Sequence, residues 1–254
     1  MNVSTCVSTT QGLRNEHQDR YCIEHSTLWK QPALILAVAD GMGGLEAGGA
    51  AAESAIETVR DSARHGLPTI GFHESPRLFL RRLFQKANER IWRFSQDHAI
   101  ESMGTTLVLA LFFGRNFLVA HVGDSRCYVL NGPRVHTLTQ DHSVAEEMAA
   151  KGQLSRGTRL FRQLRHQLTR SLGEPHRVPV ALFPARRGLG MIPAGHSVFL
   201  LCSDGLHGEV GEHEVMDEVS RDSALEERCS RLVLRALKNG STDNITVVAA
   251  EIEA

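Results

Sequence analysis

The segment that most constrains the fold of this chain is LILAVADGMGGLEAGGAAAESAIETV, from Leu34 to Val59. It joins an apolar run, typical of a buried strand, to an Ala-rich run typical of a helix, through a cluster of glycines. Asp40 stands between the strand and the glycines. A junction of this kind can hold a dinucleotide phosphate, a nucleophile or a metal ion bound by the Asp40 carboxylate.

The dinucleotide hypothesis fails on the residues of the junction. A Gly-x-Gly-x-x-Gly fingerprint would need glycine where this chain has Glu46. Asp40 would repel a pyrophosphate, and Asp61, near the distance of a ribose-binding acid, falls inside the helical pattern. The chain also has no Gly-Lys-Ser or Gly-Lys-Thr of a Walker loop.

Two serines are candidate nucleophiles. Ser203 in LCSDG lacks the first glycine of a Gly-x-Ser-x-Gly elbow. Ser125 in HVGDSR is similar to the Gly-Asp-Ser serine esterases, but the chain offers it no His and Asp partners in motif context. A serine esterase therefore stays an alternative that rests on a short tripeptide.

The metal hypothesis gathers more residues, because four other aspartates share the setting of Asp40 at or near the edge of an apolar run. A single such Asp is usually a turn or cap residue. If the strands lie side by side, however, the carboxylates crowd into one cleft, which only cations make tolerable. An oxygen-only ligand set favours Mg²⁺ or Mn²⁺, and Gly41 lacks a Cβ, so its carbonyl could approach an ion. The four are Asp19, Asp124, Asp204 and Asp243.

Several apolar runs predict strands, and two segments with one apolar face predict helices. The helices and strands do not alternate regularly, which favours a layered α+β fold over a doubly wound parallel sheet. The expected strands are Leu34–Ala39, Thr105–Phe113, Phe117–Val122 with Cys127–Leu130, Val198–Cys202 and Ile245–Ile252, and the expected helices are Ser75–His98 and a segment near Leu225–Leu237.

Length and composition indicate a globular, cytoplasmic protein. A chain of 254 residues, 42% of them hydrophobic, fits one large domain or at most two. Its formal charge of -1 means that the chain has no net positive charge that would favour binding to nucleic acid or to an anionic membrane. The five cysteines show no C-x-x-C spacing, the first residues do not have the pattern of a signal peptide, and the apolar runs are too short to span a bilayer.

The polar segment 145–172 carries five arginines. One interpretation is a solvated helix face, and the other is a mobile flap that contacts an anionic substrate. The arginines are Arg156, Arg159, Arg162, Arg165 and Arg170.

Taken together and in order, the motifs resemble those of the metal-dependent protein phosphatases, the type 2C serine/threonine family, in its bacterial form. The resemblance covers nearly the whole chain. The motifs are GLRNEHQD, VADGMGG, MGTTLVLAL, HVGDSRCYVL, LTQDHS, LTRSLG, LLCSDGL and STDNITVV. The resemblance implies one domain over residues 1–254, a four-layer α-β-β-α sandwich with two central, mainly antiparallel sheets, and hydrolysis of phosphoserine and phosphothreonine by water activated at a binuclear Mn²⁺ or Mg²⁺ centre.

The same resemblance implies roles for individual residues. Asp40 would bridge two ions, Gly41 would offer its carbonyl, and Arg14 would hold the substrate phosphate with its planar fork of donors. Asp40 and Asp204 would thus be catalytic as well as metal-binding.

The remaining acids complete the ion sites that the resemblance implies. Asp204 and Asp243 would complete one site, and Asp19 would support the second, directly or through water. Asp124 and Asp204 would form a third, weaker site. The chemistry would need no side-chain nucleophile.

Three residues depart from the family pattern. Gln18 stands where many members have Glu, so the second ion loses a formal charge. His17 replaces an Asn of bacterial relatives, and Met42 stands where animal members carry a histidine. Protonation of the leaving group would therefore fall to water or another group.

The expected partners are phosphoproteins, including a cognate serine/threonine kinase, and the expected state is a monomer. A phosphatase-like regulator without turnover is the rival hypothesis, which Gln18 favours and the intact Asp40, Asp204 and Asp243 oppose. The histidines form no metal-binding motif, and we expect them to be ordinary surface or packing residues.

Overall fold

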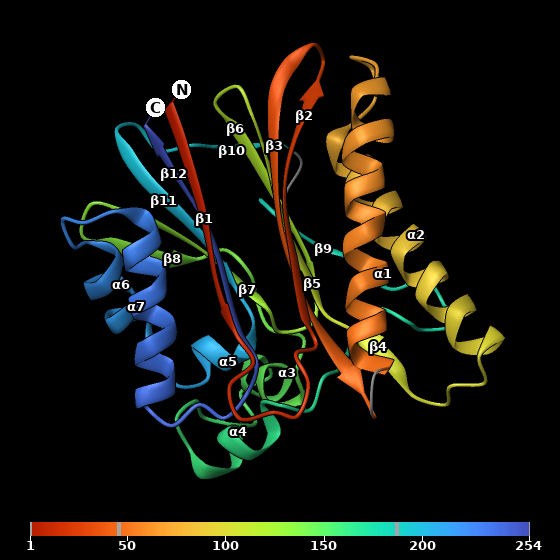
Figure 1. The fold of residues 1–254 in the computed structure, drawn as a ribbon, viewed down its shortest axis with the longest axis vertical. Coiled ribbons are helices and arrows are strands. Elements are labelled where there is room, and N and C mark those ends of the chain that lie inside the picture. The colour runs from red at the N-terminus through yellow and green to blue at the C-terminus, as the bar shows by residue number, and fades with distance from the viewer. Residues whose placement is uncertain (1, 45–46, 186–187, 254) are drawn as a thin grey trace.

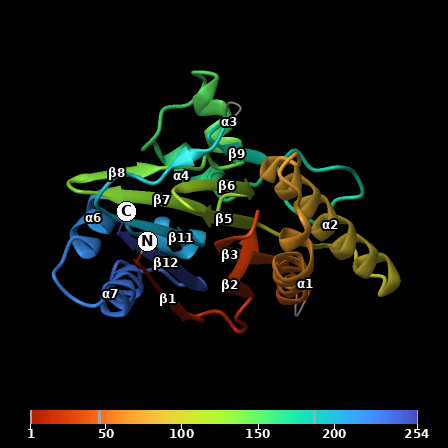
Figure 2. The same ribbon diagram turned by 90° about the horizontal axis from the view of Figure 1, so that it is seen from above.

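Two β-sheets lie face to face, and helices cover the outer face of each (Figures 1 and 2). A computed structural model describes residues 2–44, 47–185 and 188–253. Within them, one sheet has five strands in the order β1-β12-β11-β7-β8, and the other has seven, with the path β10-β6-β5-β3-β2 and with β4 on β3 and β9 on β6. Neighbouring strands in these residues pair antiparallel. The predicted α-β-β-α sandwich is confirmed.

The elements follow one another from Asn2 to Glu253. The strands are β1 (Asn2–Thr10), β2 (Asp19–Leu28), β3 (Gln31–Gly43), β4 (Met103–Thr105), β5 (Leu107–Phe113), β6 (Asn116–Val122), β7 (Arg126–Asn131), β8 (Arg134–Thr137), β9 (Ala181–Phe183), β10 (Gly190–Met191), β11 (His196–Cys202) and β12 (Ile245–Glu253). The helices are α1 (Ala47–Asp61), the π-helical η1 (Ser62–Gly66), the 3₁₀ turn η2 (Leu67–Thr69), α2 (Pro76–Asp97), α3 (Val144–Ala150), α4 (Arg159–Leu164), α5 (Asp204–His207), α6 (Glu212–Val219) and α7 (Leu225–Lys238).

The central strands are buried on both faces, which is why they appear in the sequence as continuous apolar runs. In β3, Ile35 and Ala37 belong to the core under the helices, whereas Leu36 and Val38 belong to the core between the sheets. The period of two that every strand imposes on its side chains thus divides one apolar run between two cores. A third core lies between the five-stranded sheet and the α6 and α7 helices.

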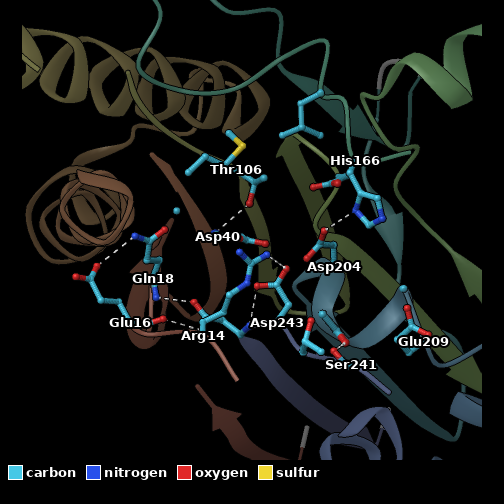
Figure 3. A pocket seen from close by; sticks show the side chains of 18 of the residues that line it. Arg14, Glu16, Gln18, Asp40, Thr106, His166, Asp204, Glu209, Ser241 and Asp243 are labelled. Atoms are coloured by element: carbon cyan, nitrogen blue, oxygen red, sulfur yellow. Dashed lines mark hydrogen bonds and ion pairs between the residues drawn. The ribbon is translucent and has the colours of Figure 1, made fainter. Parts of the chain in front are cut away.

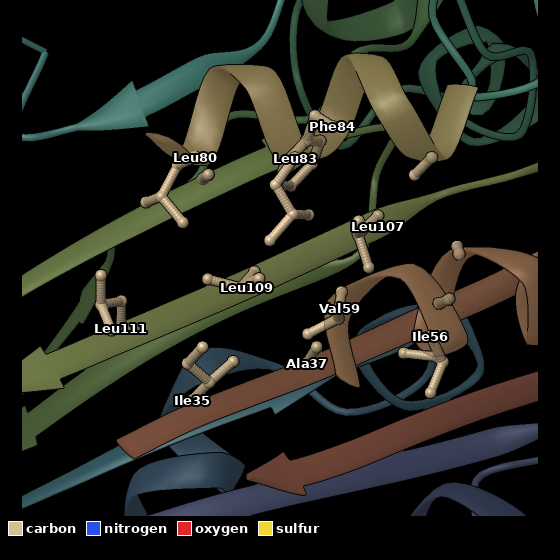
Figure 4. Packing of buried hydrophobic residues seen from close by; sticks show 14 of the residues in the cluster. Ile35, Ala37, Ile56, Val59, Leu80, Leu83, Phe84, Leu107, Leu109 and Leu111 are labelled. Atoms are coloured by element: carbon tan, nitrogen blue, oxygen red, sulfur yellow. The ribbon is translucent and has the colours of Figure 1, made fainter. Parts of the chain in front are cut away.

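The helix α2 shows how the outer layers are held. Leu80 and Leu83 point from one face of α2 toward Leu109 of β5, and Val59 of α1 reaches the same cluster (Figure 4). The apolar face predicted for this segment is therefore the face that packs on the sheet. Among the helices that the structure describes, none combines the length and apolar character that crossing a bilayer requires.

The sequence analysis misjudged some strand boundaries and missed five strands. The predicted strand Thr105–Phe113 is divided at Thr106, whose backbone N–H donates to the Asp40 carbonyl instead of continuing a strand. The missed strands are β1, β2, β8, β9 and β10. In β1 the apolar Val3, Cys6 and Val7 are interrupted by polar residues and most side chains are half-exposed, so no apolar run marks it. Glu46, which stands in the last glycine position of the dinucleotide fingerprint, lies outside the described residues.

Chain direction brings the aspartates to one end of the sandwich. The C-terminal ends of β3, β6 and β11 and the N-terminal ends of β2 and β12 lie at the lower end in Figure 1, near α3, α4 and α5. The termini of the chain meet at the opposite end, because β1 and β12 pair from Asn2 opposite Glu253 to Thr10 opposite Ile245.

Two Leu→Ala variants should separate core packing from surface exposure. Leu109→Ala should lower the free energy of unfolding by about 2–5 kcal/mol, because it leaves a cavity between β5 and α2. Leu234→Ala removes the same atoms from an exposed position of α7 and should change the free energy of unfolding by about 0.5 kcal/mol or less. Urea unfolding followed by circular dichroism measures both, and equal effects would contradict the layer assignment.

Candidate active site

A cavity of about 770 Å³ opens at this end of the sandwich (Figure 3). Its walls come from the loop after β1, the end of β3, the segment after α4, the start of α5 and the loop before β12. Of the predicted site residues, the lining contains Arg14, Asp40, Gly41, Asp124, Asp204 and Asp243.

The remaining predicted residue, Asp19, is buried next to the cavity. It lies directly opposite Asp40 in the antiparallel pair of β2 and β3. Its Oδ2 accepts a hydrogen bond of 2.8 Å from the Ser203 hydroxyl, while its buried Oδ1 has no hydrogen-bond partner among the described residues. Burial, together with the charges of Asp204 and Asp243, raises the pKa of Asp19 from 3.8 to about 7, despite the hydrogen bond from Ser203.

The backbone of Asp40 is fixed by two threonines. Its carbonyl accepts hydrogen bonds from the Thr105 hydroxyl and the Thr106 N–H, at 2.8 and 2.9 Å, and its own N–H donates to the Thr106 hydroxyl at 3.0 Å. Burial first, and then the charges of Asp19 and Asp204, raise the pKa of the Asp40 carboxyl well above its ordinary value. Asp40 therefore sits in a rigid position where a negative charge is costly.

The other carboxylates divide between two electrostatic environments. Burial and the charge of Asp204 raise the pKa of Asp124 well above its ordinary value. At Asp204 burial acts in the same direction, but the hydrogen bond with His166 and the charges of His207 and His166 outweigh it and lower the pKa. The distance between His166 Nδ1 and Asp204 Oδ2 is 3.5 Å.

Arg14 lies across the mouth of the cavity on Asp243. Its Nη2 is 2.7 Å from Asp243 Oδ2, and this hydrogen bond and charge pair raise the pKa of the guanidinium. Asn244 holds the surrounding loop, since its amide donates to the carbonyls of Gln11 and Glu16 and its Oδ1 accepts from the Gln18 N–H. The loop that carries Arg14 is thus fastened to the loop before β12.

The structure gives Gly41 a packing reason that the sequence did not reveal. A Cβ on Gly41 would lie 2.1 Å from the carbonyl oxygen of Gly48, so β3 and the first turn of α1 approach too closely for any side chain. Gly48 is equally confined, because a Cβ there would lie 2.5 Å from Gln18 Oε1.

The residues that depart from the family pattern have visible contacts. The His17 Nε2 lies 2.7 Å from the Thr9 hydroxyl, which ties it to the end of β1. Gln18 and Met42 line the cavity, and the Gln18 amide donates to Glu16 Oε2 at 3.4 Å.

The two candidate nucleophiles are fully buried and already hydrogen-bonded. Ser203 has no exposed surface, donates to Asp19, and accepts from the Thr246 N–H. Ser125 is 1% exposed and shares a hydrogen bond of 2.7 Å with Thr106. Both serines therefore act as supports for the aspartates, and the geometry disfavours the esterase hypothesis.

The donor chemistry of the cavity fits divalent cations. The aspartates are oxygen ligands, two of those that line the cavity carry raised pKa values, and the buried Oδ1 of Asp19 is unpaired within the described part of the chain. Cations relieve repulsion of this kind. Even so, the described residues contain no ready group of three Asp, Glu, His or Cys side chains in ligand arrangement. Arg14 and Ser203 hold two of the acids in hydrogen bonds instead.

The sequence did not reveal the roles of three residues of this site: His166 and Asn244 were not predicted to belong to it, and Ser203 was considered only as a nucleophile. His166 was expected to be an ordinary surface or packing residue, yet it contacts Asp204 in the cavity. It lies in a polar segment whose pattern gave no indication of which way it faces. Asn244 and Ser203 each stand next to a predicted aspartate, and that adjacency was the available signal for both.

Comparison with known proteins gives this geometry a family. The model of the family described as protein phosphatase 2C matches residues 4–245. The chain belongs to that family. It is accordingly a phosphoprotein phosphatase, an enzyme that hydrolyses phosphoric monoesters.

Relatives support the assignment over nearly the full length of the chain. The serine/threonine phosphatase stp of Listeria welshimeri is 33% identical over 223 residues, which are 87% of this chain and 84% of that protein. The crystal structure of the serine/threonine phosphatase Stp1 from Staphylococcus aureus has a TM-score of 0.86 and 27% identity, with 100% of this chain and 96% of that chain covered. The catalytic domain of the serine/threonine protein phosphatase PstP, in complex with two manganese ions, has a TM-score of 0.80 and 25% identity, with 99% of both chains covered.

The raised pKa of Asp19 predicts how stability depends on pH. The folded protein holds this proton more tightly than the unfolded chain does, so the contribution is fully present below the ordinary pKa of 3.8 and is lost as the pH rises through about 7. In the presence of a chelator, Tm should fall between about pH 4 and pH 7 and fall less in Asp19→Asn. Calorimetry measures the slope, and equal slopes would contradict the shifted pKa.

Proposed function

We propose that the protein hydrolyses phosphoserine and phosphothreonine monoesters of proteins, with water as the direct nucleophile at a binuclear Mn²⁺ or Mg²⁺ centre, and that residues 1–254 form a single phosphatase domain. The observation that carries the proposal is the convergence of Asp19, Asp40, Asp124, Asp204 and Asp243 on one cavity beside Arg14. The relatives named serine/threonine phosphatases support the substrate class.

The carboxylates would bind two ions, and a third ion would bind more weakly. Asp40, in the middle of the group, would bridge the ions, with the Gly41 carbonyl beside it. Asp204 and Asp243 would complete one site, and Asp19 would support the second. Asp124 would join Asp204 in the third. The two manganese ions of the related PstP domain support this assignment.

The ions, when bound, would supply a water of lowered pKa and would offset the charge that develops on the phosphoryl oxygens. The contribution of the chain is position and charge. Thr105 and Thr106 fix Asp40, Ser203 fixes Asp19, and His166 favours the ionised form of Asp204. These contacts would hold the acids in position through successive rounds of substrate binding and product release.

Arg14 is suited to binding the substrate phosphate. Its side chain is 59% exposed, and its one ion pair among the described residues is with Asp243, an acid that would also serve as a metal ligand. With Asp243 in that role, the guanidinium fork of Arg14 would be available to a phosphate dianion. Arg14 would thus bind the substrate phosphate at the mouth of the cavity.

The segment 145–172 would act as a flap over the cavity, but the arginines do not contribute equally. Arg156 pairs with Glu146 at 2.7 Å, and Arg162 donates to the Gly157 carbonyl, so both stabilise the segment itself. Arg165 lines the cavity and donates to the Gly208 carbonyl. Arg165 is therefore the arginine of the flap placed to contact a bound substrate.

The proposed partners follow from the activity. Phosphoproteins would be the substrates, and a serine/threonine kinase that modifies the same proteins would be the opposing enzyme. We also propose that the protein acts as a monomer in the cytoplasm.

Replacement of one acid of the cavity tests the proposal against the regulator without turnover. Asp204→Ala should lower manganese-dependent kcat on p-nitrophenyl phosphate and on a phosphothreonine peptide by about 100-fold or more, since even groups that merely orient metal ligands are worth about 10- to 100-fold. Asp217→Ala, on the outer helix α6, is the matched control and should keep full activity. A wild-type protein without turnover would support the regulator instead.

A second pair of variants tests the flap. Arg165→Ala should lower kcat/KM for a phosphopeptide more than for p-nitrophenyl phosphate, because the small ester does not extend to the wall of the cavity that Arg165 forms. Arg159→Ala and Arg162→Ala, which replace flap arginines outside the cavity lining, should have smaller effects. Equal losses on both substrates for Arg165→Ala would show that it acts on the cavity as a whole and not on the peptide.

A further inference from the structure

Two thiols from distant parts of the chain meet in the core under α7. Cys6 lies on β1 and Cys229 on α7, and their Sγ atoms are 2.7 Å apart. Carbon atoms in ordinary contact lie about 3.5–4.0 Å apart, whereas the sulfurs of a disulfide are about 2.05 Å apart. The two sulfurs therefore lie closer than packing alone requires.

The surroundings keep the two thiols together. Cys6 is the buried side chain of the otherwise half-exposed strand β1 and faces the core that Leu225, Cys229 and Leu232 form on the inner face of α7. Its Sγ is also 3.6 Å from the carbonyl oxygen of Leu225. Cys6 and Cys229 are 5% and 1% exposed, so neither side chain has a route out to solvent without movement of β1 or α7.

Cys22 and Cys127 lie in different cores from Cys6 and Cys229, whereas Cys202 shares their core but lies on another strand, β11. Cys127 and Cys202 are on the neighbouring strands β7 and β11, but Cys127 faces the core between the sheets and Cys202 faces the core under α6 and α7. Cys22 lies in the core under α1 and α2. The sheet thus separates thiols that the strand pairing alone would place close together.

We propose that Cys6 and Cys229 form an oxidation site, at which hydrogen peroxide closes an intramolecular disulfide between β1 and α7. One thiol attacks peroxide, forms a sulfenic acid and releases one water. The second thiol then attacks that sulfur, the S–S bond forms, and the sulfenic oxygen leaves as a second water. The two thiols lose two hydrogens and two electrons, and one peroxide becomes two waters.

The reaction should be slow in the native protein. The hydrogen bond with Cys6, followed by burial, raises the pKa of the Cys229 thiol, which makes the reactive thiolate scarce. Access for the oxidant requires β1 to open, and β1 can do so because it is the edge strand of its sheet. The site would therefore respond to sustained oxidation rather than to a brief pulse.

The disulfide would connect residues 223 positions apart and so would restrict nearly the whole unfolded chain. It would also fix β1, whose C-terminal end leads into the loop that carries Arg14. The expected consequence is a protein that resists heat better when oxidised than when reduced.

The full-length reduced protein, treated with hydrogen peroxide under native conditions and then alkylated in denaturant, tests the proposal. We expect an intact mass before alkylation that is about 2 Da lower than that of the thiol form, alkylation of only three of the five cysteines afterwards, a cross-linked peptide pair containing Cys6 and Cys229, and a rise in Tm of about 5 °C or more that dithiothreitol reverses. Peptide mapping of the wild-type chain needs no variant, so a folding defect cannot obscure it.

Single variants provide the controls. Cys6→Ala and Cys229→Ala should each abolish the cross-link, and Cys22→Ala should keep it. A cross-link between any other two cysteines, full alkylation of both Cys6 and Cys229 after exhaustive treatment, or a retained cross-link in Cys6→Ala would overturn the proposal. None of these measurements depends on phosphatase turnover, so their outcome is independent of the proposed function.

Discussion

The repulsion among buried carboxylates at one end of the sandwich is the constraint on which the site depends. Burial and mutual charge raise the pKa of Asp19, Asp40 and Asp124, and the surrounding hydrogen bonds offset only part of that cost. A fold selected for stability alone would have replaced some of these acids with neutral residues. Functional sites commonly accept repulsion of this kind, and the gathering of these acids in one place supports the proposed cation site.

The sandwich makes that concentration of charge possible. The hydrophobic cores lie on both faces of each sheet, and the strand ends that carry the aspartates meet at one end of the sandwich, near α3, α4 and α5 (Figure 1). The hydroxyls of Thr105 and Thr106 hold the backbone of Asp40, and the hydroxyl of Ser203 donates to Asp19. The cores lie beside the site, and Arg165, His166 and Leu168 of the segment 145–172 form part of its wall.

Much of the site was predictable because its acids follow or precede apolar runs, and the chain direction of those strands decides where they end. Asp40, Asp204 and Asp243 carry this signal clearly. The strand β1 was not predictable in the same way, since Asn, Ser and Thr interrupt its apolar residues along a half-exposed edge strand. His166 was missed because a short polar helix and its loop give no periodicity from which a direction could be read, and the approach of Cys6 to Cys229 has no sequence signature at a separation of 223 residues.

The pairing of β1 with β12 places both ends of the polypeptide side by side, at the end of the sandwich remote from the cavity. A fluorophore, an affinity handle or a surface tether attached at either terminus would therefore leave the catalytic opening facing bulk solution. Because Asn2 and Glu253 are neighbours, a short linker could join the two ends, and new termini could be introduced in a loop elsewhere to give a circularly permuted protein.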